Sequence, residues 1–244
     1  MEWSDDAIVL SARPHGETGA ILEVLTREHG RHLGLVRGGA SRRVKPILQP
    51  GNTVRLNWRA RLPDHLGSFT PEPSKSRAGT ILDSREALTG LNAFSSMVSL
   101  TMHEREVHAP VFEAGEILLD AIVTDSLSHW GPLYVRWEMG LLEALGFGLD
   151  LSTCAATGAS EDLIYVSPRS GRAVSRAGGG IYAERLFVLP GFLLGSQNGE
   201  ASRADLLAGL KLTGYFLQER VLRPHNRELP PARLRLEEFA ARES

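Results

Sequence analysis

The chain has 244 residues, 42% of them hydrophobic and 23% charged, a composition that excludes a disordered or fibrous protein. No apolar run approaches the roughly 20 residues that cross a bilayer, and the acidic residues 1–6 do not resemble a signal peptide. We therefore expect a soluble, cytoplasmic protein without a membrane partner. The single cysteine, Cys154, excludes an internal disulfide and any site with several cysteine ligands.

The net charge of −2 hides a separation of charge along the chain. Residues 1–80 carry 12 basic and 8 acidic side chains, residues 81–153 carry 3 and 11, and residues 154–244 carry 12 and 10. Residues 27–77 alone hold 11 basic and 3 acidic side chains, a net charge of +8. A segment of this kind either attracts a polyanion or forms an ordinary solvated surface.

Five short strands are predicted in the first 80 residues. Apolar runs bounded by Gly or Pro predict strands at residues 7–12, 20–26 and 32–37, and another at 66–70 that Pro71 and Pro73 end. Residues 53–61 alternate strictly, which assigns a buried face and a solvent face. The solvent face comprises Arg55, Asn57, Arg59 and Arg61, and the buried face comprises Val54, Leu56, Trp58 and Ala60. Five such strands favour a small closed barrel, which leaves no exposed sheet edge.

After residue 80 the apolar residues recur at helical spacing. We predict helices from Asp83 or Ser84 to Met102, from Pro110 to Ile122, and over residues 133–145, 204–222 and 231–242. A loop rich in Gly and Ser separates the third and fourth helices at residues 150–191, with a hairpin at 167–171. The fold class is therefore α+β, with a barrel domain at 1–80 and a helical domain at 81–244.

The chain lacks the phosphate-loop, dinucleotide-binding and nucleophile-elbow motifs, so nothing in it requires catalysis. Arg42, Arg43 and Lys45 follow the flexible pair Gly38-Gly39, and such a loop either grips phosphates or is simply solvated. Trp3 and Trp58 are either base-stacking residues or part of the core, and the alternation around Trp58 favours the core.

Several stretches resemble the RecO family of bacterial DNA repair proteins. The similar stretches run in order through IVLSARPHGE at residues 8–17, LQPG at 48–51, RWEMGLLEALGFGLD at 136–150, YVSPRSGRAV at 165–174 and LRP at 222–224. The resemblance implies an N-terminal five-stranded OB-fold barrel followed by a helical domain, and it identifies residues 150–191 as a zinc-ribbon-like loop. It also implies a recombination mediator rather than an enzyme.

Members of this family bind single- and double-stranded DNA and anneal complementary strands. With RecR they act on strands coated by single-stranded-DNA-binding protein, so that RecA can load. We predict phosphate contacts from seven side chains: Arg37, Arg42, Arg43, Lys45, Arg55, Arg59 and Arg61. The resemblance also implies that the helical region receives the acidic C-terminal tail of single-stranded-DNA-binding protein, and Arg136 is a candidate contact for it.

Many family members carry four cysteine zinc ligands in the loop. Here the four positions hold Cys154, Thr157, Ser175 and Gly178, and no histidine lies between residues 129 and 225. Because a structural zinc ion requires four Cys or His ligands, we predict no metal and no cofactor. Local hydrogen bonds and the packing of residues 163–166 must then hold the loop.

Two other functions remain open from the residues alone. A barrel rich in arginine also suits an acidic protein partner, and a salt titration of DNA binding separates the two. A nuclease requires a carboxylate cluster beside the basic surface, whereas the acidic residues lie mainly in the helical block. Magnesium-dependent cleavage of a labelled oligonucleotide is the test for that activity.

Overall fold

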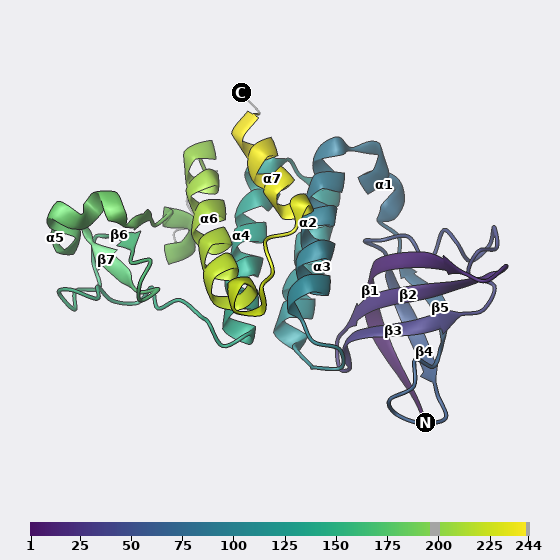
Figure 1. Cartoon of the computed structure of the whole chain (residues 1–244). Helices are drawn as coiled ribbons and strands as arrows, with labels where there is room; N and C mark the ends of the chain where they lie inside the picture. The colour runs from purple at the N-terminus through teal and green to yellow at the C-terminus, as the bar shows by residue number, and fades with distance from the viewer. Residues whose placement is uncertain (196–200, 243–244) are drawn as a thin grey trace. The chain divides into compact units, whose positions relative to one another are not determined.

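The computed structural model describes residues 1–195 and 201–242, and the chain divides into two compact units, Met1–Thr124 and Asp125–Ser244. Unit 1 contains a closed barrel and the three helices that follow it, and unit 2 contains further helices and a small sheet (Figure 1). Within the described residues, no helix is long and apolar enough to cross a membrane.

The barrel of unit 1 consists of β1 (Glu2–His15), β2 (Gly19–Thr26), β3 (Gly30–Val36), β4 (Thr53–Arg59) and β5 (Ser68–Lys75). The strands pair in the order β1-β2-β3-β5-β4, and β4 closes the barrel by pairing with β1. All pairs are antiparallel except β3 and β5, which pair in parallel through Leu35 with Ser68 and Val36 with Phe69. This is the predicted five-stranded OB-fold barrel.

The prediction that Pro71 and Pro73 end the fifth strand is wrong. β5 continues to Lys75 and pairs with β4 through both prolines, opposite Leu56 and Val54. Because Pro71 and Pro73 are two residues apart, their backbone nitrogens point to the same edge of β5. A proline, which lacks the N–H, is tolerated at an edge that pairs with no other strand. Beyond Phe69 the other edge of β5 has no such pairing, because β3 contacts only its first two residues.

The alternation predicted for residues 53–61 is confirmed in β4, where Val54, Leu56 and Trp58 are buried and Arg55 and Arg59 are exposed. The side chains of Val54, Leu56 and Trp58 belong to the barrel core, which also contains residues from the other four strands. Trp58 is 3% exposed and its Nε1 donates to the carbonyl of Leu66, so the core role of this ring is confirmed.

Three helices complete unit 1: α1 (Ala78–Asp83), α2 (Arg85–Thr101) and α3 (Ala109–Thr124). The Ser84 side chain accepts a hydrogen bond from the backbone of Ala87 and caps α2, as predicted. The sequence prediction missed α1, which buries Ala78 and Ile81.

Unit 2 is built on α4 (Leu127–Ala144), α6 (Arg203–Phe216) and α7 (Pro231–Arg242). α4 begins six residues before the predicted helix start and contains Pro132, which the prediction had placed outside it. The helix predicted over 204–222 is α6 followed by a π-helical turn, η3 (Leu217–Leu222), and a 3-10 turn, η4 (Arg223–His225), leads on toward α7.

The loop between α4 and α6 contains a three-stranded sheet of β6 (Leu163–Val166), β7 (Ala173–Ser175) and β8 (Phe187–Val188), in the order β7-β6-β8. The predicted hairpin at 167–171 joins β6 to β7, and the Ser167 nitrogen donates to the Arg172 carbonyl at 2.9 Å. Short helical turns α5 (Arg176–Gly179), η1 (Gly180–Arg185) and η2 (Gly191–Leu194) complete the described part of the loop.

Candidate nucleic-acid interface

Of the seven side chains predicted to contact DNA phosphates, most of those without an ion pair lie in the connection from β3 to β4. We call residues 37–45 of this connection the basic segment; its cations are Arg37, Arg42, Arg43 and Lys45. All four side chains are exposed, and no described carboxylate lies within 4.0 Å of their charged nitrogens. Because no ion pair neutralises them, their charge remains available to a polyanion.

The basic segment is fixed to the barrel by apolar side chains. Val44, Ile47 and Leu48 follow helical spacing and pack on the barrel core, and Leu48 is 2% exposed. Turn hydrogen bonds support this conformation, including Lys45 nitrogen to Ser41 carbonyl at 2.9 Å. The side chains of the basic segment therefore project from a turn that is anchored on the barrel.

The two glycines at the start of the segment have different roles. Gly38 has a φ of +67°, which only glycine adopts without strain. A Cβ at Gly39 would lie 2.7 Å from the Cβ of Ala20, so the chain there packs tightly against β2. Gly38 thus permits the backbone turn, and Gly39 permits its close packing on β2.

The arginines of β4 lie in a row of mixed charge. Arg55 lies beside Asp6 of β1, with Nη1 and Oδ1 3.3 Å apart, and Arg59 lies beside Glu2 at 4.0 Å. Both pairs are exposed, so solvent screens them and they stay accessible. Arg61 is exposed just beyond β4. Arg59 and Arg61 lie at the end of β4 that pairs with Glu2, whereas the basic segment leads into its other end, Thr53.

Four further cations within residues 27–77 are already paired. Arg27 binds Glu113 of α3 at 2.6 Å, and Arg31 binds Glu23 at 2.9 Å. Lys75 binds Asp120 of α3 at 2.7 Å, and Arg77 contacts both Glu116 and Asp120 at 2.8 Å. Carboxylates from outside residues 27–77 therefore neutralise part of the net charge of +8, and these four cations are less available to a polyanion.

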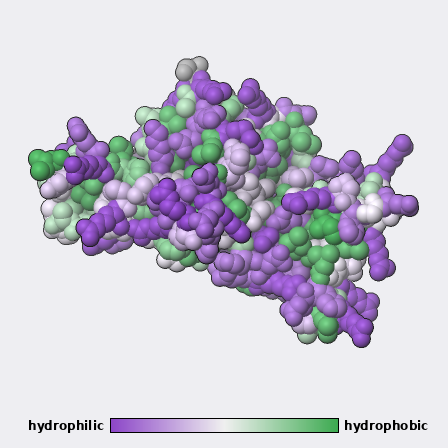
Figure 2. All heavy atoms as spheres, in the orientation of Figure 1, coloured by the Kyte–Doolittle hydropathy of each residue, from purple (hydrophilic) through white to green (hydrophobic). Residues whose placement is uncertain are grey.

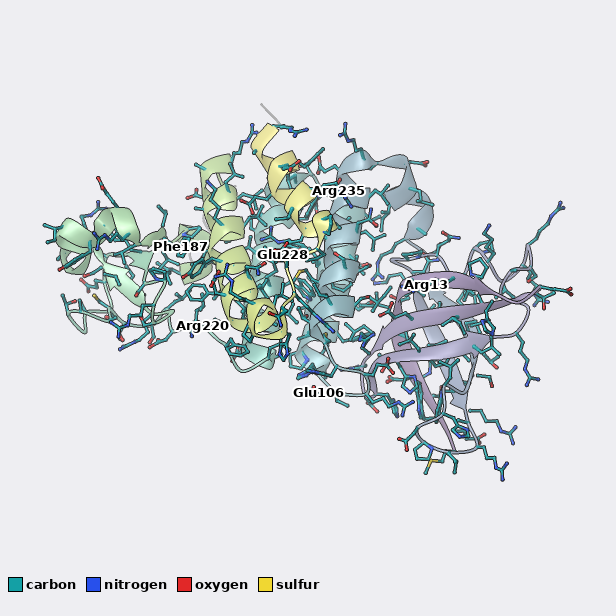
Figure 3. All side chains as sticks on the ribbon, in the orientation of Figure 1. Arg13, Glu106, Phe187, Arg220, Glu228 and Arg235 are labelled. Atoms are coloured by element: carbon teal, nitrogen blue, oxygen red, sulfur yellow. The ribbon has the colours of Figure 1, made fainter. Side chains whose placement is uncertain are left out.

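One exposed cation near the basic segment was not predicted. Arg13 of β1, labelled on the barrel in Figure 3, lines the same hollow as Lys45. No described carboxylate lies within 4.0 Å of its guanidinium. Arg13 is 32 residues from Lys45 in the sequence, and only the pairing of the barrel strands brings the two residues together.

Figure 2 shows hydrophilic side chains over much of the visible barrel surface, with a smaller hydrophobic patch among them.

Trp3 is partly buried and contacts other aromatic rings of the barrel. Its ring stacks on His29 with centroids 4.1 Å apart and on Trp58 at 5.5 Å. His29 in turn contacts Asp5, with Nδ1 and Oδ2 2.9 Å apart. Trp3 therefore belongs to an aromatic cluster that lines a hollow of the barrel together with His29, His32 and Trp58.

Arg136 of α4, the candidate partner contact, is held within unit 2. Its Nε and Nη2 atoms donate to the Phe192 carbonyl at 3.2 and 2.6 Å, which ties α4 to η2. The guanidinium is only part-buried. These hydrogen bonds give the Arg136 side chain a structural role within unit 2.

The four loop positions that hold zinc ligands in many family members come together here around a single sulfur atom. Cys154 Sγ accepts hydrogen bonds from the Ser175 nitrogen and hydroxyl at 3.2 and 3.3 Å and from the Thr157 nitrogen at 3.4 Å. A Cβ at Gly178 would lie 2.8 Å from Sγ. Within the described residues, no three His, Cys, Asp or Glu side chains are grouped to hold a metal ion.

These hydrogen bonds also change the chemistry of the thiol. Burial alone would raise the pKa of Cys154, but the hydrogen bonds from Ser175 and Thr157 outweigh burial and lower the pKa to about 6. The Ser175 hydroxyl in turn accepts from the Gly178 nitrogen at 3.1 Å. Hydrogen bonds thus join Thr157 and Ser175 directly to the sulfur and Gly178 to it through Ser175, at the positions that a metal ion joins in a zinc ribbon.

Comparisons with known proteins agree with this architecture. Residues 1–77 match the family model described as Recombination protein O N terminal, and residues 82–229 match Recombination protein O C terminal. A DNA repair protein RecO of Cereibacter sphaeroides is 52% identical over 244 residues, covering 99% of both chains. Those of Caulobacter vibrioides and Phenylobacterium zucineum are 52% and 51% identical over 234 residues, 96% of this chain and 95% of each relative. The chain therefore belongs to the RecO family of DNA repair and recombination proteins.

Proposed function

We propose that the chain binds single- and double-stranded DNA through the basic segment and acts as a recombination mediator that catalyses no reaction. The observation that carries the proposal is the set of four exposed cations without ion pairs, Arg37, Arg42, Arg43 and Lys45, on one anchored turn. Phosphate contacts of this kind are independent of sequence. Arg55 and Arg59 contribute more weakly, since Asp6 and Glu2 partly compensate them, and Arg61 adds an exposed cation just beyond β4.

Annealing of complementary strands follows from the same chemistry. Two polyanions approach one another when cations screen their repulsion, and contacts limited to phosphates leave the bases free to pair. No general acid, base or metal ion is needed for this step. The proposed partners follow from family membership: RecR, the C-terminal tail of single-stranded-DNA-binding protein at unit 2, and RecA as the protein that is loaded. Association with the nucleoid during repair belongs to the same proposal.

Strand annealing by the purified protein, without nucleotide or metal, tests the proposal directly. We expect the protein to anneal complementary oligonucleotides. Its DNA affinity should fall steeply as salt rises, and each phosphate contact with a single strand should add about 0.7 to the slope of log affinity against log salt concentration. The triple variant Arg42→Ala/Arg43→Ala/Arg59→Ala should anneal slowly. Unchanged annealing in this variant overturns the site assignment. Binding of an acidic peptide with no binding of DNA would instead support a role as a protein scaffold.

A further inference from the structure

A hollow of about 160 Å³ opens beside the basic segment. The residues from β1, the β1–β2 turn and the β3–β4 connection that form its wall are mainly aliphatic: Ala12, Pro14, Ala20, Ala40, Leu48 and Pro50. Sites for whole drug-sized ligands are larger, about 300–1,000 Å³. This hollow therefore suits a single ring system rather than a large ligand.

The polar groups of the hollow are two cations and one amide. Arg13 and Lys45 both line it, and neither pairs with a described carboxylate. Gln49 donates from Nε2 to the Lys45 carbonyl at 3.3 Å, while its Oε1 accepts no hydrogen bond from the described residues. An apolar wall beside two free cations is complementary to a ligand that joins an uncharged ring to negative charge.

We propose that the hollow takes one unpaired base of a single DNA strand, with the flanking phosphates on Arg13 and Lys45. This inference rests on the proposed function, because the basic segment must first bring the strand to the barrel. Aliphatic contact and the Gln49 amide then add a term that depends on the base, beyond the attraction of phosphates. Bases that are paired and stacked in a duplex stay out of the hollow, so a duplex contacts only the cations.

The inference predicts a selective effect when the hollow is filled without a change of charge. Ala12→Leu and Ala40→Leu each place a larger side chain at its wall, and Ala12 and Ala40 are both exposed positions. Ala40 lies outside the strands and its backbone nitrogen binds the Thr18 carbonyl, a bond that leucine preserves, so this variant carries the test if Ala12→Leu misfolds. Thr70→Leu adds an exposed leucine to β5 outside the hollow and is the matched control.

Three probes of equal length separate the contributions: an oligothymidylate strand, an abasic deoxyribose-phosphate strand, and a duplex. We expect both filling variants to bind the oligothymidylate about tenfold more weakly, because the base loses its apolar contact with the wall of the hollow. Both variants should bind the other two probes as the unaltered protein does. Arg13→Ala should weaken binding of all three probes, and Thr70→Leu should weaken none.

Two results would overturn the inference. Equal weakening of all three probes by the filling variants would show that the leucine perturbs phosphate contacts, and no weakening of any probe would show that the hollow stays empty. In both cases the unaltered protein still binds DNA, so the proposed function stands. An unaltered protein that binds none of the probes would overturn the proposed function itself.

Discussion

Arg77 donates from Nη2 to Oε2 of Glu116 at 2.8 Å, and only 2% of the Arg77 side chain is exposed. The same guanidinium donates from Nε to Asp120 at 2.8 Å and from Nη1 to the Thr53 hydroxyl at 2.7 Å. Two carboxylates of α3 and a hydroxyl of β4 thus surround one cation inside unit 1. Arg77 serves the packing of unit 1 and does not belong to the surface that we propose for DNA binding.

Replacing Arg77 should therefore damage stability more than binding. Arg77→Ala removes the hydrogen bonds of a buried guanidinium and leaves Glu116 only the more distant Lys75 nitrogen, 3.9 Å away, as an ion partner. Because Glu116 and Asp120 remain in contact with water, we expect a loss of about 1.5–3 kcal/mol of unfolding free energy. Urea unfolding measures this loss. The exposed Arg42→Ala is the control, and it should stay within about 0.5 kcal/mol of the unaltered protein. A stability loss as small as that control would assign Arg77 no structural role.

The salt dependence of DNA affinity should separate the unpaired cations from the paired ones. Arg42→Ala/Arg43→Ala should reduce the slope of log affinity against log salt by about 1.4 for a single strand, at about 0.7 per phosphate contact. Arg55→Ala/Arg59→Ala should reduce the slope less, because Asp6 and Glu2 already compete for these guanidinium groups. Equal slopes for the two double variants would contradict the distinction and make the β4 row a full part of the interface.

The barrel could be predicted from the sequence because its signal is local. In β4 every second residue is apolar, and the pleat of a strand converts that period directly into one buried and one exposed face. The helical spacing of Val44, Ile47 and Leu48 is equally local, and it would have predicted that the basic segment is anchored. That signal was present in the sequence and was missed.

The charges could not be assigned in the same way, because their partners are distant. Arg27 and Glu113 are 86 residues apart, and Arg77 and Glu116 are 39 apart, so a sum over residues 27–77 counts them as free. Arg13 is the opposite case: it lies outside that segment, yet the pairing of β1 with β2 places it at the hollow beside Lys45. Only tertiary structure separates cations that hold the fold from cations that face a ligand.

Cys154 should make the stability of unit 2 depend on pH. Its pKa is about 6 in the folded protein, below the value of 9.0 for an unperturbed thiol. The native state therefore favours the thiolate, and its contribution to stability is complete above the unfolded pKa of 9.0. That contribution decreases as pH falls from 9.0 and is lost as pH passes through the folded pKa of about 6.

Urea unfolding of the protein and of Cys154→Ser, measured at several pH values between 6 and 9, tests this linkage. We expect the protein to exceed the variant in stability most at the upper end of the range, and the gap to narrow as pH falls. The serine hydroxyl stays neutral in this range, so the variant lacks the titration but keeps a hydrogen-bonding group. Two stability profiles that run parallel across the range would contradict a thiolate in the native state.

The buried pair of Glu138 and Arg233 joins three helices of unit 2. Arg233 Nε donates to Glu138 Oε1 at 2.6 Å and Nη2 donates to Oε2 at 3.0 Å, and neither side chain is exposed. Nη2 also donates to the Leu210 carbonyl at 2.7 Å, and Thr213 donates to Glu138. The pair therefore links α4, α6 and α7. Burial raises the pKa of the nearby Tyr134, and the Glu138 carboxylate raises it further, so that phenol stays neutral.

Glu138→Leu should destabilise unit 2 by about 3–5 kcal/mol, because the buried Arg233 would lose its buried partner and keep only the partly exposed Glu237, 3.5 Å from Nη1. In the double variant Glu138→Leu/Arg233→Met both charges are gone and apolar packing replaces them, so most of the lost stability should return. Arg242→Ala, which removes an exposed pair with Glu238, is the control and should change stability by less than about 0.5 kcal/mol. Urea unfolding of the four proteins measures these differences. A double variant that is less stable than Glu138→Leu would mean that the hydrogen bonds of Arg233 to Leu210 matter more than the charge pair itself.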